Sequence, residues 1–200
     1  MAQSTARNAE RDAAQAEEEG AARNLTLLTD LYQLTMMSGY LKNGKQNDIA
    51  VFDLFFRRNS VITYSVAAGL EQAVAYIRSI RFTEEDIAYL RSLGLFEEPF
   101  LDYLRSFRFT GDVFAVPVVF PEEPILTVRA PLLEAQFVET ALLNIVNHQT
   151  LIATKAAKIA YAAAGGEVME FGLRRAQGPD AGVYGARAAV IGGCGSTSNV

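Results

Sequence analysis

Two arginines and a turn rich in glycine and hydroxyl groups lie close together near the C-terminal end of the chain. Arg174 and Arg175 follow the strand pattern of 168–171, and residues 192–199 read Gly-Gly-Cys-Gly-Ser-Thr-Ser-Asn. A guanidinium offers forked donors that match a carboxylate or a phosphate, and a turn that opens a helix offers free backbone N–H groups. The pattern therefore predicts a site for an anionic ligand, with a pair of solvated surface arginines as the alternative.

Other reactive side chains give weaker signals. Arg57 and Arg58 close the strand pattern of 49–56, where they either bind phosphate or mark the exit of the strand to solvent. His148 is the only histidine and lies within a helical pattern, so we interpret it as structural. One histidine and one cysteine, Cys194, give no support for a zinc site or a Cys–His pair.

The composition is typical of a soluble globular protein. Half of the 200 residues are hydrophobic and a fifth are charged. The formal net charge of −5 argues against a general nucleic-acid binder, whose phosphate contacts need a basic face. No run reaches the roughly 18 apolar residues of a membrane span, and a single cysteine excludes an internal disulfide. We expect no nucleic-acid or membrane partner and a cytoplasmic location.

Hydrophobic periodicity divides the chain into a tail and two parts. Residues 1–23 contain almost no large apolar side chain, which predicts a disordered tail. Helical patterns then cover 31–40, 69–79, 83–93 and 97–107, and strand patterns cover 49–56, 61–66, 112–120 and 125–128. Thr83 followed by Asp86 predicts a capping box. Pro117 within the third strand pattern indicates an edge strand or a bulge.

The last 70 residues follow a different order. A helical pattern runs from Pro131 to Ala164, and its length leaves open a break near Asn147-His148. A short buried strand over 168–171 and a small-residue helix over 180–190 follow. We predict an α/β fold with a mixed α+β domain over 24–130. Residues 131–200 would begin an α/β barrel or layered sheet, with the barrel incomplete in this chain.

Seven ordered motifs together resemble nicotinate phosphoribosyltransferases. They lie at 29–33, 52–58, 123–126, 131–136, 147–155, 171–178 and 192–200, and the resemblance covers about residues 24–200. It implies that nicotinate and phosphoribosyl pyrophosphate give nicotinate mononucleotide and pyrophosphate, assisted by Mg²⁺ and by ATP as co-substrate, in the salvage route to NAD.

The resemblance also implies roles for single residues. Phe171 matches the aromatic side chain that stacks on the pyridine ring, and Arg174 matches the arginine that meets the ring's carboxylate. Tyr32 matches a tyrosine that closes the other ring face from the partner subunit of a homodimer, and Arg57 matches an arginine near the phosphates. Thr197 stands where related nicotinamide-using enzymes carry an aspartate, which would repel a carboxylate, so a neutral threonine favours nicotinate.

The family's catalytic histidine, which ATP phosphorylates during turnover, is expected beyond Val200, and His148 is not its counterpart. We therefore expect an N-terminal fragment that is inactive alone and folds poorly, because a barrel cut after its first strands leaves an unpaired edge. Two alternatives stay open. One is a nicotinamide or quinolinate phosphoribosyltransferase, and the other is a non-catalytic chain that binds or dimerises.

Overall fold

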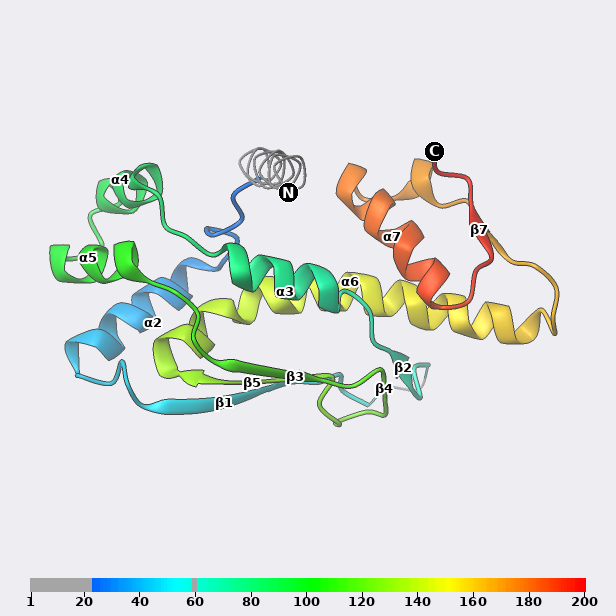
Figure 1. Cartoon of the computed structure of the whole chain (residues 1–200), viewed down its shortest axis with the longest axis horizontal. Coiled ribbons are helices and arrows are strands. Elements are labelled where there is room, and N and C mark those ends of the chain that lie inside the picture. Colours follow the sequence, from blue (N-terminus) through cyan, green and yellow to red (C-terminus); the bar gives the residue numbers. More distant parts are fainter. Residues whose placement is uncertain (1–22, 59–60) are drawn as a thin grey trace, which may run out of the picture.

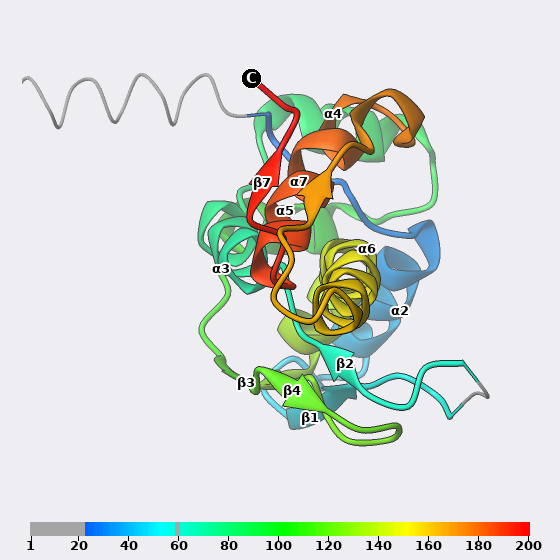
Figure 2. The ribbon, with the colours of Figure 1, turned by 90° about the vertical axis from the view of Figure 1, so that its right-hand side faces the viewer.

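The computed structural model describes residues 23–58 and 61–200, so the predicted tail lies outside the described residues except for Arg23. A long helix, α6 (Leu132–Ala162), runs through the molecule and connects a larger group of elements to a smaller one. Figure 2 looks roughly along α6 and shows the sheet on one side of the helix and α7 (Pro179–Ile191) on the other. The mixed α/β class predicted from the sequence is confirmed.

The larger group is built on an antiparallel sheet in the order β1-β5-β3. Its strands are β1 (Ile49–Leu54), β3 (Asp112–Ala115) and β5 (Leu126–Pro131). Successive side chains of a strand leave opposite faces of the sheet, and in the central strand Leu126, Val128 and Ala130 are buried. Helix α2 (Leu31–Lys42) packs beside α6 over the inner face of this sheet.

Proline divides the strand that was predicted over 112–120. β3 ends at Ala115, and β4 (Val118–Val119) pairs instead with the two-residue strand β2 (Ser65–Val66). Pro117 lacks an N–H, and its carbonyl accepts from the N–H of Ala67 at 2.9 Å, so the chain changes partner there. The strand predicted over 61–66 is correspondingly short, and residues 59–60 lie outside the described part.

Three short helices complete the larger group: α3 (Leu70–Ser79), α4 (Glu84–Ser92) and α5 (Glu98–Ser106). The predicted capping box is confirmed. The hydroxyl of Thr83 accepts from the N–H of Asp86 at 3.1 Å, and the carboxylate of Asp86 accepts from the N–H of Thr83 at 2.8 Å.

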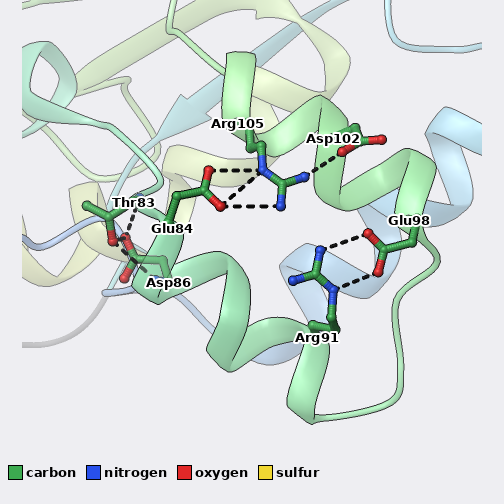
Figure 3. A network of polar contacts seen from close by, with 7 residues as sticks. All are labelled: Thr83, Glu84, Asp86, Arg91, Glu98, Asp102 and Arg105. Carbon is green, nitrogen blue, oxygen red and sulfur yellow. Dashed lines mark hydrogen bonds and ion pairs between the residues drawn. The ribbon is translucent and has the colours of Figure 1, made fainter.

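Ion pairs join α4 to α5 on the surface. Arg91 meets Glu98 at 2.7 Å, and Arg105 meets both Glu84 at 3.0 Å and Asp102 at 2.5 Å. Figure 3 shows the guanidinium of Arg105 directed at Glu84 and Asp102, and that of Arg91 directed at Glu98. These contacts fix the hairpin of α4 and α5 over the core but touch no candidate site residue.

Helix α6 is continuous, so the break left open near Asn147-His148 does not occur. The helix contains no glycine or proline, the residues at which sharp kinks arise. Two of its hydroxyls are used by the backbone of the 66–68 segment: Thr154 accepts from the N–H of Val66 at 3.0 Å, and Thr150 accepts from that of Ala68 at 3.2 Å.

The two ends of α6 belong to different packing environments. Its first half enters a large apolar core with α2 to α5 and the sheet, where Phe137 contacts the rings of Phe82 and Phe107 at 5.2 and 5.1 Å between centroids. Its second half meets α7 through small side chains such as Ala153 and Ala188. The boundary proposed at residue 131 stays a prediction.

The smaller group is a strand–helix–strand unit. β6 (Met169–Glu170) leads through the 3-10 helix η1 (Leu173–Arg175) to α7, and β7 (Ser196–Thr197) then pairs parallel to β6. Two expectations are corrected here. The strand predicted as buried has exposed ends, because Met169 is 54% and Phe171 46% exposed. The Gly192-Gly193 turn closes α7 and enters β7 rather than opening a helix. Within the described residues no barrel closes.

Candidate functional site

The parallel pair β6–β7 brings two polar side chains together. Glu170 and Thr197 are register partners, and the N–H of Ser198 donates to the carbonyl of Glu170 at 2.9 Å. Parallel neighbours in register project on the same side of the sheet. The hydroxyl of Thr197 accordingly donates to the Glu170 carboxylate at 2.8 Å.

Further backbone donors complete this corner. The N–H of Gly172 donates to the other oxygen of the Glu170 carboxylate, and the N–H of Asn199 donates to the Thr197 hydroxyl oxygen at 3.2 Å. The amide nitrogen of Asn199 reaches the carbonyl of Gly182 on α7 at 3.4 Å. The end of β7 is thereby tied both to β6 and to the first turns of α7.

Glycine allows α7 to lie close enough to α6 to hold this corner in place. A Cβ at Gly192 would stand 2.3 Å from the carbonyl oxygen of Ala153 and 2.6 Å from the Cβ of Ala156. Both distances are far below van der Waals contact. The small residues that the sequence places around 180–193 therefore set the distance between the two helices, and with it the position of the 192–199 turn.

A cavity of about 270 Å³ lies where α6, the 170–177 segment and the start of α7 meet. Three of its lining residues have ionisable side chains, namely Glu170, Arg175 and His148. His148 lies 3.2 Å through Nε2 from the carbonyl of Ala181, so that nitrogen donates and carries the proton. The remaining lining residues are Ile152, Gly172, Ala176, Gln177, Ala181, Gly182, Gly185 and Ala186.

The four C-terminal candidates of the sequence lie in this one region. Phe171, Arg174 and Arg175 are exposed on the segment after β6, and Thr197 lies across from it on β7. Arg175 lines the cavity, whereas Phe171 and Arg174 do not. The prediction that Arg174 meets a carboxylate stays a prediction.

Tyr32 and Arg57 lie in the larger group of elements. Tyr32 is on α2, 53% exposed, and α2 and β7 lie toward opposite ends of α6 (Figure 1). A single chain therefore keeps Tyr32 apart from Phe171, and its assignment to a partner's site stays a prediction. Arg57 is exposed just after β1, and its phosphate role also stays a prediction.

Tyr32 has an acidic environment that sequence reasoning missed. Reduced hydration, followed by the negative charges of Asp30 and Glu139, raises the pKa of its half-exposed phenol. The hydroxyl of Thr140 donates to Asp30 at 3.0 Å, and the buried amide of Gln33 donates to Glu139 at 2.5 Å. These bonds hold α2 against α6 and so fix the position from which the Tyr32 side chain projects into solvent.

Sequence reasoning also missed that Glu170 and His148 line the cavity. A carboxylate directly before Phe171 was a visible signal, but its contact with Thr197 depends on the β6–β7 register. Cys194 is buried, and burial, with a further contribution from Glu170, raises the pKa of its thiol. A thiol that stays protonated is a poor nucleophile.

The described residues form no group of three or more His, Cys, Asp or Glu side chains that could hold a metal ion. They therefore supply no all-protein Mg²⁺ site, and we derive no step through Mg²⁺. In residues 23–58 and 61–200 no helix combines the length and the apolar character that crossing a membrane requires.

Comparison with known proteins shows the same kind of enzyme repeatedly. Residues 27–147 match the family described as nicotinate phosphoribosyltransferase (NAPRTase) N-terminal domain. The chain is 49% identical over 181 residues to the nicotinate phosphoribosyltransferase of Bacillus subtilis (strain 168), covering 88% of this chain and 37% of that protein. It is 41% identical over 181 residues to nicotinate phosphoribosyltransferase 1 of Arabidopsis thaliana, covering 87% and 32%.

The fold is similar to solved structures as well. The crystal structure of human nicotinic acid phosphoribosyltransferase superposes with a TM-score of 0.77 at 39% identity, over 86% of this chain and 36% of that chain. A nicotinate-nucleotide pyrophosphorylase from Pyrococcus furiosus shares the fold, with a TM-score of 0.65 at 23% identity over 88% of this chain and 39% of that chain. The chain thus spans about a third of the length of the curated relatives that it matches.

Proposed function

This chain belongs to the nicotinate phosphoribosyltransferase family, and from that premise we propose that it forms the nicotinate-binding part of such an enzyme. The reaction joins nicotinate to phosphoribosyl pyrophosphate, giving nicotinate mononucleotide and pyrophosphate, with ATP hydrolysed alongside. The proposal includes Mg²⁺, a homodimer with shared sites, a cytoplasmic location and a place in NAD salvage. The chain spans about a third of its relatives, so every property of a whole enzyme belongs to this proposal.

One observation carries the assignment to nicotinate. The β6–β7 pairing joins Glu170 to Thr197, and Glu170 and Arg175 both line a small cavity on the segment that also carries Phe171 and Arg174. At about 270 Å³ the cavity is smaller than the pockets of roughly 300–1,000 Å³ that hold drug-sized ligands, so it suits a single-ring compound. Arg175 among its lining residues favours an anionic one.

In this reaction the pyridine nitrogen is itself the nucleophile, so the protein's task is to position the ring. Phe171 would cover one ring face, Arg174 would bind the carboxylate, and the partner's Tyr32 would cover the other face. Holding a nucleophile in the attack geometry removes translational and rotational freedom before the reaction and can supply several kcal/mol. Arg57 would contact phosphate oxygens.

His148 does not fit the role of the histidine that ATP phosphorylates. Its Nε2 donates to the carbonyl of Ala181 within the α6–α7 contact, which a phosphoryl group on that nitrogen would break. The proposal therefore assigns His148 to the wall of the cavity.

Ligand binding tests the proposal directly. We expect calorimetric titration of the 200-residue chain to show binding of nicotinate in preference to nicotinamide and quinolinate. Arg174→Ala should weaken nicotinate binding roughly 10- to 100-fold, because a hydrogen bond to a charged group is worth about 1.5–3 kcal/mol. Arg78→Ala, at an exposed arginine in the last turn of α3, is the matched control.

Catalysis can be tested with a chimera. Residues 24–200 would replace the matching segment of the Bacillus subtilis relative, to which the chain is 49% identical. Formation of nicotinate mononucleotide by the chimera, and its loss in Phe171→Ala, would support the proposal. A folded chimera that uses quinolinate or nicotinamide and ignores nicotinate would replace it with one of those activities.

A further inference from the structure

The carboxylate of Glu170 lies beside Thr197, the uncharged residue that the sequence analysis linked to a preference for nicotinate. Thr197 was expected to favour nicotinate because it carries no charge. Glu170 is its register partner, and the two side chains are joined by a 2.8 Å hydrogen bond. Glu170 also lines the cavity beside the 171–175 segment. A negative charge is therefore present at this corner, supplied by β6 instead of β7.

The hydrogen bonds that the Glu170 carboxylate already accepts affect which ligand can bind beside it. One Glu170 oxygen accepts from the N–H of Gly172 and the other from the hydroxyl of Thr197. An ionised carboxylate only accepts hydrogen bonds. With both oxygens engaged by fixed donors, Glu170 has less capacity left to accept from the NH₂ of a carboxamide, and its charge is partly balanced for a neighbouring carboxylate.

Thr197 in turn is committed to the protein. Its single proton goes to Glu170, and its oxygen accepts from the N–H of Asn199 at 3.2 Å. The side chain therefore has no second proton to donate to a ligand carboxylate. Its effect on ligand choice would have to pass through Glu170, while Arg175 supplies the positive charge on the same cavity wall.

We propose that Glu170 is a determinant of the choice between a pyridine carboxylate and a pyridine carboxamide, and that the Thr197 hydroxyl suppresses its preference for the carboxamide by donating to it. This inference rests on the proposed function, because it concerns the same ligand site. It adds a residue that the family resemblance did not assign, and it predicts a change in ligand preference for one substitution where neutrality of residue 197 alone predicts none.

The deciding substitution is Thr197→Val, which keeps the shape of the side chain and removes the hydroxyl that donates to Glu170. If neutrality of residue 197 were sufficient, valine would leave the preference for nicotinate intact. If Glu170 is the determinant, valine releases one carboxylate oxygen, which then accepts from the amide of nicotinamide and repels the carboxylate of nicotinate.

Calorimetric titrations of the whole 200-residue chain with nicotinate and with nicotinamide measure the ratio of the two dissociation constants. We expect Thr197→Val to move this ratio at least tenfold toward nicotinamide, and Thr197→Ser to leave it within about threefold of the original. The double variant Thr197→Val with Glu170→Gln should lose the shift, because the released group is no longer charged.

Ser196→Ala is the matched control. Ser196 also lies on β7, and its hydroxyl also donates to a glutamate, Glu167, at 3.1 Å, but neither residue lines the cavity. Its removal should leave the ratio unchanged. Circular dichroism and thermal melting of each variant show that a change in binding does not arise from unfolding.

The outcomes separate the two proposals. Nicotinate binding with the same ratio in wild type and Thr197→Val would overturn the role of Glu170 and leave the proposed function standing. Binding of nicotinamide by Thr197→Val, with no binding of nicotinate by the wild type, would overturn the proposed function and support the role of Glu170. Failure of every folded variant to bind either ligand would overturn both.

Discussion

The two ends of α6 differ in how their neighbours are held. Around its first half, large side chains from five helices and a sheet are fully buried, among them Phe137, Leu101 and Leu104. Around its second half the contacts are made by Ala153, Ala188 and glycines, and large side chains such as Val183 stay on the surface. Packing at the first end depends on large buried side chains, whereas packing at the second end depends on small residues that let α6 and α7 lie close together.

This contrast has a functional meaning. A core of large side chains contributes most of the apolar area removed from water and so most of the stability. A contact between small residues places backbone and loops with precision while contributing little area. The candidate site lies at the second end, where the 192–199 turn is held against α6 and β6.

Removing volume from the large core should have the greatest effect. We expect Phe137→Ala to lower the free energy of unfolding by about 3–5 kcal/mol, because it deletes a fully buried ring and leaves a cavity. Ile152→Ala, at a partly buried residue facing α7, should cost clearly less. Urea denaturation of both variants measures the difference, and equal losses would contradict the contrast between the two ends.

Adding side-chain volume should destabilise the protein most at the second end of α6, where α7 lies close to it. We expect Gly192→Ala to cost about 1–3 kcal/mol, because its Cβ would meet the carbonyl oxygen of Ala153 at 2.3 Å. Hydrogen exchange should increase in α7 while the sheet stays protected. Gly39→Ala, which meets nothing within 4 Å on α2, is the control and should stabilise by about 0.5–1 kcal/mol.

The large core should also make stability depend on alkaline pH. Burial raises the pKa of Tyr76 and of Tyr103 above the ordinary value of about 10. Below that value the phenols are neutral in both states. Above it the unfolded chain loses protons that the folded chain retains, so stability falls as pH rises, by up to about 1.4 kcal/mol per pH unit for each group.

Tyr76→Phe tests this dependence. The Tyr76 hydroxyl is buried without a partner in the described part of the chain, so its removal should be neutral or stabilise by up to about 1 kcal/mol at neutral pH. Chemical denaturation between pH 8 and 11 should show a smaller slope in the variant. A slope equal to that of the wild type would show that Tyr76 ionises in the folded chain as readily as in the unfolded one.

Surface ion pairs should give the smallest effects. Arg105 contacts two carboxylates between α4 and α5 (Figure 3), whereas Arg187 on α7 contacts Glu71 on α3. Exposed pairs contribute about 0–1 kcal/mol and are screened by salt. We expect Arg105→Ala to cost slightly more than Arg187→Ala at low ionic strength, and both losses to shrink in 1 M salt. Losses that persist there would indicate a packing role.

Local signals predicted the elements well. The Thr83–Asp86 capping box and the helices around it formed because the signal and the structure involve the same few residues. The motifs that resemble nicotinate phosphoribosyltransferases identified the family, which the comparisons confirmed. The interruption at Pro117 was anticipated, but its new partner, Ala67, was not visible from spacing alone.

What the sequence determined by itself was most of the elements, the family and the part of the chain that carries Phe171, Arg174 and Thr197. Only the tertiary structure decided that Glu170 binds Thr197, that Arg175 lines the cavity, and that Tyr32 stands apart from both. The physical reason is the sequence separation over which each kind of interaction acts. Caps and periodicity act within a few residues, whereas the Glu170–Thr197 contact spans 27 residues and exists only because α7, through its glycines, lies close to α6.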